Sequence, residues 1–246
     1  MSFSNMRALS VLIACFCSGT LWSQTTILTG SVHQDYIGKP AYLYVISDAV
    51  SGLKVLKDSA TIGQDGMFRF KLNETAVVEA NLSIDRVNAT FFSAPGANYE
   101  VYFPQFPTDQ ARSFNNTNAV NLVFNNLPAK DINSQVSLFN RDFDNFFDQN
   151  VSNVFDQQFR GAMNKFREYC DSTYKKAGSA FLDEYINFAF ANFDLSIGTS
   201  RKLITDQYLK YTGNTADPEF AAFVLKFFGD YIGKFETYSK NKPLTA

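Results

Sequence analysis

This sequence is poor in the residues that most often carry out catalysis. Its 246 residues include one histidine, His33, and three cysteines. A single histidine cannot supply the commonest metal sites, which combine several histidine and cysteine ligands. A Ser-His-Asp triad would have to use His33, and no G-x-S-x-G motif is present to provide the serine. No P-loop and no G-x-G-x-x-G motif occurs either. We therefore expect no catalytic residues, no metal and no cofactor in this chain.

Excess charge of one sign is also missing. The formal net charge is -2, and Lys and Arg are scattered along the chain. A nucleic-acid-binding domain usually gathers these residues into a basic stripe. The charge pattern therefore argues against a nucleic-acid partner.

The three cysteines do not form a redox motif. Cys15 and Cys17 lie near the N-terminus, and Cys170 lies far along the chain, so there is no C-x-x-C motif. The helical spacing of Cys170 from Phe166 and Tyr174 favours a buried cysteine on a helix. The alternative is that Cys170 is a reactive or intermolecular thiol.

Residues 1–23 have the pattern of a signal peptide. A short polar segment with one positive charge, MSFSNMR, precedes the apolar run ALSVLIACFC. This run is much shorter than the roughly 20 residues that span a bilayer, and we favour cleavage after Ser23. The competing interpretation is a lipobox, Leu12–Cys15, in which Cys15 is lipidated. Either way the protein is expected to be exported to the periplasm or outer envelope, without a transmembrane segment but with a lipid anchor in the second case.

Residues 24–104 are predicted to form a small antiparallel β-sandwich. Seven short segments alternate apolar and polar residues, and Asn, Pro and Gly separate them. In the segment IGQDGMFRF, Asp65-Gly66 supplies the positive-φ position that a tight hairpin needs. Phe68 and Phe70 then fall on one face of the next strand. This segment is therefore predicted to be the tip of a hairpin between two core-facing strands.

Residues 105–130 are rich in Pro, Asn and Thr and are predicted to be a linker, in which AVNLVF could add one more strand. From residue 131 to 246 the apolar period changes to that of helices. Five amphipathic helices are predicted, with Asp131 and Ser179 as N-caps and Pro218 at the start of the last. The predicted fold class is therefore α+β, a β-sandwich followed by an all-α helical array.

The helical half is unusually rich in aromatic residues. The whole chain contains 26 Phe and 12 Tyr. Phe at helical spacing is typical of a core, since each buried side chain stabilises by roughly 1.5–3 kcal/mol. The number of these residues also raises the hypothesis that one helical face covers another domain or a second copy. The acidic residues Asp142, Asp144 and Asp148 alternate with Phe on one of these helices and are interpreted as its solvated face.

The order of segments resembles one family of exported proteins. ILTGSV, AYLYVI and VLKDSATIGQDGMFRF follow the signal in the order seen in TlpA/thioredoxin-like envelope proteins of Gram-negative bacteria. In that family a β-sandwich and helices precede a thioredoxin domain, and PEFAAFVLKFFGDYIGKF resembles the helix just upstream of it. The C-x-x-C motif of that domain has no counterpart here, so no catalytic residue can be carried over.

Two functional hypotheses follow. The resemblance implies the non-catalytic N-terminal portion of a thiol-disulfide envelope protein, which positions or presents a redox domain. The expected partner is then another protein or a further C-terminal domain. The alternative is a self-contained envelope module that binds a glycan, a peptide or a protein, with Tyr36, Tyr42 and Tyr99 as candidate contacts.

Overall fold

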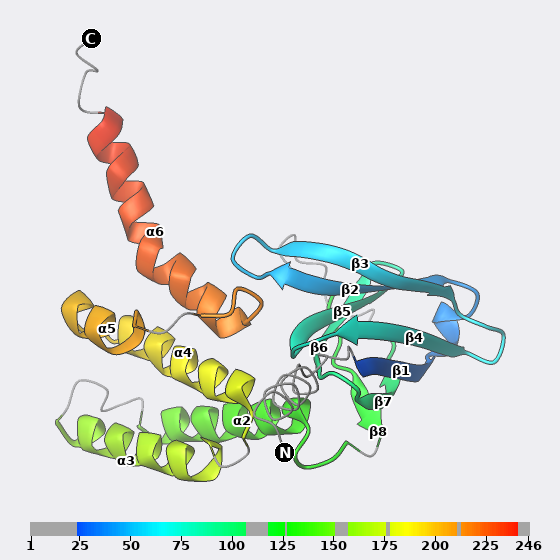
Figure 1. The fold of residues 1–246 in the computed structure, drawn as a ribbon, viewed down its shortest axis with the longest axis horizontal. Coiled ribbons are helices and arrows are strands. Elements are labelled where there is room, and N and C mark those ends of the chain that lie inside the picture. Colours follow the sequence, from blue (N-terminus) through cyan, green and yellow to red (C-terminus); the bar gives the residue numbers. More distant parts are fainter. Residues whose placement is uncertain are drawn as a thin grey trace, which may run out of the picture.

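The computed structural model describes residues 24–106, 118–125, 127–150, 157–175, 178–210 and 213–240, with only the backbone of 157 and 230–240. The predicted signal peptide, including Cys15, lies outside these residues. The described part begins with strands and ends with helices, which confirms the α+β class (Figure 1). The strands are β1 (Gln24–Val32), β2 (Pro40–Asp48), β3 (Leu53–Thr61), β4 (Met67–Glu74), β5 (Val78–Ile84), β6 (Val87–Ser93), β7 (Asn98–Phe103) and β8 (Val123–Asn125).

The strands form two four-stranded sheets. One sheet has the order β4-β1-β7-β8, and the other has the order β3-β2-β5-β6. All pairs are antiparallel except β1 and β7, which run parallel. Alternate residues of both sheets face inward, and they make one core that contains Leu28, Leu43, Phe70, Leu82 and Phe103. These five side chains are fully buried, as the alternating pattern predicts.

The segment IGQDGMFRF forms the predicted turn but not the predicted hairpin. Gly66 has φ 71°, and the side chain of Asp65 accepts a hydrogen bond from the backbone N–H of Met67 at 3.0 Å. However, β3 pairs with β2 in one sheet, while β4 pairs with β1 in the other. The turn therefore joins the two sheets at a corner. A local turn signal fixes the reversal of the chain, whereas the pairing partner depends on contacts far away in the sequence.

The helices are α2 (Ile132–Asn150), α3 (Gln157–Thr173), α4 (Ala180–Ser196), α5 (Arg201–Tyr208) and α6 (Pro218–Lys240). The predicted caps are confirmed. Asp131 Oδ1 accepts from the N–H of Asn133 at 2.8 Å, and Ser179 Oγ accepts from the N–H of Leu182 at 3.3 Å. Pro218 is the first residue of α6. At this position an N–H would have no partner within the helix, so proline is well tolerated.

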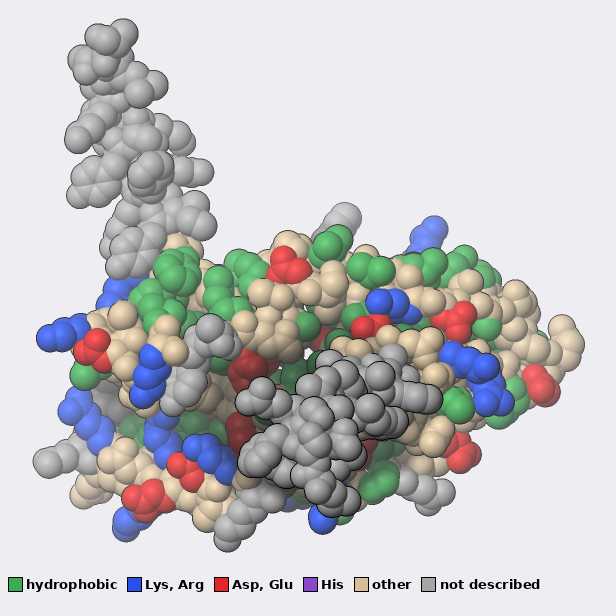
Figure 2. Space-filling model, viewed as in Figure 1, with side chains coloured by type: hydrophobic (Ala, Val, Ile, Leu, Met, Phe, Trp, Pro, Cys, Tyr) green, Lys and Arg blue, Asp and Glu red, His purple; other side chains and the backbone are tan. Residues whose placement is uncertain are grey.

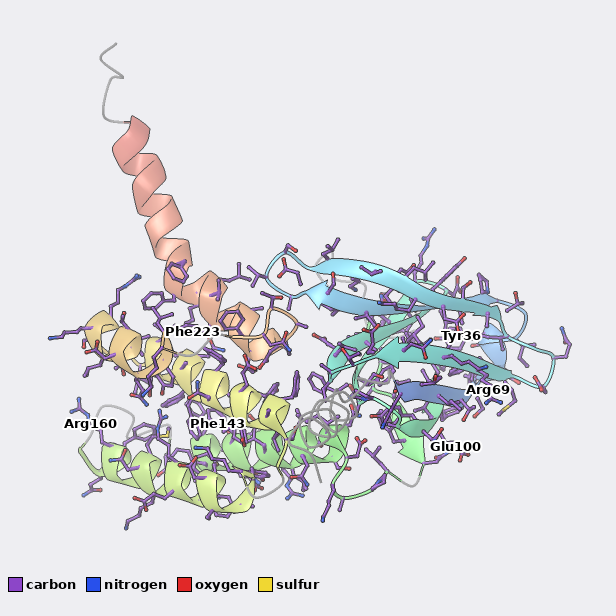
Figure 3. All side chains as sticks on the ribbon, viewed as in Figure 1. Tyr36, Arg69, Glu100, Phe143, Arg160 and Phe223 are labelled. Atoms are coloured by element: carbon purple, nitrogen blue, oxygen red, sulfur yellow. The ribbon has the colours of Figure 1, made fainter. Side chains whose placement is uncertain are left out.

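Two aromatic cores hold the helices together. Phe143 extends from α2 toward α4, and its ring centroid lies 5.7 Å from that of Phe190 (Figure 3). Phe223 extends from α6 toward Phe188 of α4, at a centroid distance of 5.4 Å. α4 therefore packs against α2 on one side and α6 on the other. Figure 1 shows the far half of α6 extending away from the rest of the fold.

The helices also pack on the sandwich. Phe92, on the outer face of β6, lies 5.1 Å from Phe181 of α4 between ring centroids. Residues 118–125, within the stretch predicted as a linker, run back along the sandwich and add β8 to the edge of β7. The fold therefore brings the start of α2 beside β6.

Candidate ligand groove at the junction of sandwich and helices

A groove of about 1070 Å³ lies where α2 meets the sandwich. One wall comes from β6 and the segment that leads to α2, and it offers the apolar side chains Phe92, Leu122 and Phe124. The other wall is α2. Its side chains in the groove are mostly polar, namely Asn133, Ser134, Ser137, Asn140, Arg141 and Asp144. One apolar wall opposite a row of hydrogen-bonding groups is typical of a binding site for an organic ligand.

Asn133 fixes the position of α2 against β6. Its side-chain Oδ1 accepts from the backbone N–H of Phe92 at 2.7 Å, and its Nδ2 donates to the backbone C=O of Phe92 at 2.8 Å. Asp131 holds this amide in place, because its Oδ1 accepts from both the backbone N–H and the Nδ2 of Asn133. The two walls are thus joined by directional bonds as well as by aromatic packing.

The groove contains both signs of charge. Arg141 and Asp144 project from α2, and Glu79 lies on β5. Desolvation raises the pKa of the Glu79 carboxyl, an effect that the positive charge of Lys54 partly opposes. A neighbouring hollow of about 400 Å³ shares Asn140 and Asp144 with the groove and continues between α2 and α4. The polar row of α2 is therefore accessible over several helical turns.

A buried carboxylate lies where the α5–α6 connection meets α4. Asp217 has no exposed surface; its Oδ1 accepts from the N–H of Glu219 at 2.8 Å, and its Oδ2 has no partner among the described residues. Burial raises the pKa of Asp217 to about 7, and the negative charges of Glu184 and Glu219 act in the same direction. The connection also contacts the sandwich, since Thr215 O accepts from the N–H of Ala49 at 2.7 Å.

A second polar network ties α3, α4 and α5 together. Arg167 donates to both carboxylate oxygens of Asp194, at 2.8 and 2.9 Å, and to the hydroxyl of Tyr208 at 3.0 Å. Its guanidinium also lies 4.3 Å from the centroid of the Phe190 ring. Each member is satisfied by another, so this network is best understood as structural. Arg160 is exposed about two helical turns earlier on α3 (Figure 3).

Cys170 lies in the helical core. Its side chain has no exposed surface, and desolvation raises the pKa of its thiol to about 12, with further contributions from the charges of Asp142 and Asp171. The thiolate is the form that reacts. At neutral pH the thiol of Cys170 is therefore protonated and shielded from solvent.

The other residues that the sequence analysis singled out lie apart from one another and from the groove. Tyr36 and Tyr99 are buried in the sandwich core, while Tyr42 is exposed on β2. His33 follows β1 and caps a short 3-10 helix, η1 (Gln34–Tyr36). Asp142, predicted to be solvated, accepts from the hydroxyl of Tyr174 at 2.6 Å. None of these residues lines the groove.

Sequence reasoning did not find the groove. Its central residue, Asn133, follows the predicted cap Asp131 by two positions but contacts a backbone 41 residues away. No sequence signal identified β6 as the strand that α2 covers.

Comparisons with known proteins leave the family open. No protein-family model matches this chain, and no curated protein matches it. Across the described residues, no group of three or more His, Cys, Asp or Glu side chains could hold a metal ion. No helix in the described part is long and apolar enough to cross a bilayer.

Proposed function

We propose that this chain is a non-catalytic binding module of the bacterial cell envelope, and that the groove between β6 and α2 is its ligand site. The observation that carries the proposal is the groove itself, with an apolar wall on a sheet and a polar wall on a helix. The bonds of Asn133 to Phe92 join the two walls directly. A preformed site loses little conformational entropy on binding, which favours affinity.

The test is a binding screen against panels of envelope glycans and of peptides, with one groove-filling variant. Ser137 is exposed on the groove side of α2, so Ser137→Trp places a large ring in the groove. Ser172 is an exposed serine on α3, away from the groove, and Ser172→Trp is the matched control. We expect Ser137→Trp to weaken binding by about tenfold or more, and the control to bind as the unmodified protein does. A ligand that binds both variants equally would place its site elsewhere.

A second candidate function is the presentation of a thioredoxin-like domain, as the resemblance implies. The observation that favours it is the apolar surface of α5 and α6. Leu203, Leu225 and Phe228 are 59%, 56% and 42% exposed. Figure 2 shows hydrophobic side chains over the base of α6 and along the neighbouring upper edge of the molecule. Exposed apolar patches often mark contact with another domain or protein.

This second candidate has its own test. A C-x-x-C motif in the reading frame beyond Ala246, together with a larger intact mass of the native protein, would support it. We then expect Leu225→Asp to weaken the association of this chain with the isolated redox domain, measured by chromatography of the mixture. Ser172→Asp, at an exposed position on α3, controls for the single added charge. No association of the unmodified chain would count against this function and leave the groove proposal unaffected.

A further inference from the structure

β6 is the outermost strand of its sheet, and the phase of its hydrogen bonds can be worked out. The turn between β5 and β6 has two residues, Asp85 and Arg86, with φ 49° and 69°. In such a turn the flanking residues form a hydrogen-bonded pair, here Ile84 and Val87. Hydrogen-bonded and non-hydrogen-bonded pairs then alternate along an antiparallel ladder. The backbone groups of positions 88, 90 and 92 therefore point away from β5, toward the free edge.

Two of these three positions are already paired. The N–H of Asn88 donates to Asn118 O at 2.8 Å, and the C=O of Asn88 accepts from the N–H of Val120 at 2.9 Å. At the other end, the side-chain amide of Asn133 binds both backbone groups of Phe92. Backbone groups of residues 118–120 thus bind one end of this edge, and the side-chain amide of Asn133 binds the other.

The position between them is open. Thr90 is exposed and lines the groove, and no hydrogen bond to its backbone N–H or C=O occurs within the part of the chain that the structure describes. The segment that pairs with Asn88 leaves the edge after Val120, because it continues into β8 on the other sheet. Each of the neighbours Asn88 and Phe92 lies two residues, about 6.8 Å, from Thr90 along the strand. One further peptide unit therefore fits opposite Thr90, between the groups that bind Asn88 and Phe92.

We propose that the backbone of Thr90 binds a main-chain amide of an extended peptide, which adds a one-residue strand to the edge of β6. This inference rests on the proposed function and names its ligand class. Peptides commonly bind an exposed sheet edge in this way, with main-chain bonds for affinity and adjoining side chains for selectivity. The groove supplies those side chains, since Leu122 lies on the sandwich wall and Ser137 and Asn140 lie on α2.

The decisive variant is Thr90→Pro, because proline removes the N–H of residue 90. This N–H makes no bond to β5, and proline is tolerated in edge strands where the N–H faces outward. Thr90→Val keeps the N–H and is the matched control. The probe is a pooled library of N-acetylated, C-amidated tetrapeptides, applied to the full chain. The tightest binder is also made with an ester in place of each amide in turn.

We expect Thr90→Pro to weaken binding of the peptide about fivefold to tenfold, the effect of one lost hydrogen bond, and Thr90→Val to leave it nearly unchanged. One of the ester analogues should show a similar loss. Equal binding by Thr90→Pro, or by every ester analogue, would overturn the proposal.

Hydrogen exchange in the unmodified protein provides a second readout that needs no variant to fold. Without peptide, the amide of Thr90 should exchange much faster than the amides of Asn88 and Phe92, and saturating peptide should slow it. An unchanged rate at Thr90 would overturn the peptide assignment. If an oligomer of N-acetylglucosamine slows the exchange and no peptide does, the ligand class is wrong while the groove remains the binding site. If nothing in either set binds, the proposed function fails as well.

Discussion

Asp217 gives the sharpest quantitative expectation for this protein. Its carboxyl group is fully buried at the start of α6, and one of its oxygens has no partner among the described residues. Burial, assisted by the charges of Glu184 and Glu219, raises its pKa from 3.8 to about 7. The perturbation that we consider is Asp217→Asn. This change keeps the Oδ1 acceptor that caps α6 and removes the charge at every pH.

The sign of the effect follows from the direction of the shift. The folded state binds the proton of Asp217 more tightly than the unfolded state, so unfolding releases a proton between about pH 4 and pH 7. Stability is therefore greatest when Asp217 is protonated and falls as the pH rises through this window. A shift from 3.8 to about 7 corresponds to about 4 kcal/mol in total, of which about 3 kcal/mol is lost between pH 4 and pH 7.

The assay is urea unfolding of both proteins at several pH values between 4 and 8. The free energy of unfolding of the unmodified protein should fall across the window by about 3 kcal/mol more than that of Asp217→Asn. The difference between the two slopes is the relevant quantity, because Glu79, Asp183 and Glu219, whose pKa values desolvation also raises, contribute to both. Parallel curves, within about 0.5 kcal/mol throughout, would show that Asp217 ionises normally in the fold and would refute this reasoning.

Two substitutions and one labelling experiment test the packing of the helices. Asn133→Ala removes two hydrogen bonds to a strand backbone and should lower the free energy of unfolding by about 2–3 kcal/mol, whereas Asn145→Ala, exposed on the same helix, should change it by less than about 0.5 kcal/mol. Arg167→Met leaves its carboxylate partner on α4 unpaired and should cost about 3 kcal/mol, with Arg160→Met as the exposed control in the same denaturation assay. Cys170 should react with a thiol reagent at neutral pH only at the rate of unfolding, and rapid labelling of the folded protein would contradict its burial.

The sequence was sufficient for the elements and for the fold class. Period-two alternation identified the strands. Helical spacing of Phe, with the caps Asp131 and Ser179 and with Pro218 at a first helical position, identified the starts of helices. These signals are local, so they are visible in a single sequence. Pairing is not local. The Asp65-Gly66 turn was predicted correctly, yet its flanking strands belong to different sheets.

The candidate site could not be predicted for the same reason. Its defining contact joins Asn133 to the backbone of Phe92. Because nearly every residue has the same backbone groups, the sequence does not indicate which residue Asn133 contacts. The open position at Thr90 depends on the phase of the β5–β6 turn. Asp85-Arg86 adopts positive φ angles without the Asn-Gly or Asp-Gly pair that usually announces such a turn. Residues 118–120 pair with the edge only because the chain returns to the sandwich before α2 begins.

The amide of Asn133 connects the stability of the fold with the proposed binding site. It closes the edge of β6 at Phe92 and at the same time attaches α2 to the sandwich. If the edge remained open at both Thr90 and Phe92, two adjacent positions could pair with a foreign strand, and long exposed edges favour aggregation. The side-chain amide of Asn133 binds both backbone groups of one edge residue, so no further strand is needed to satisfy them. Among the described residues this leaves a single free unit on the edge of β6, the unit to which we propose that a peptide binds, and that unit is too short to start pairing between sheets.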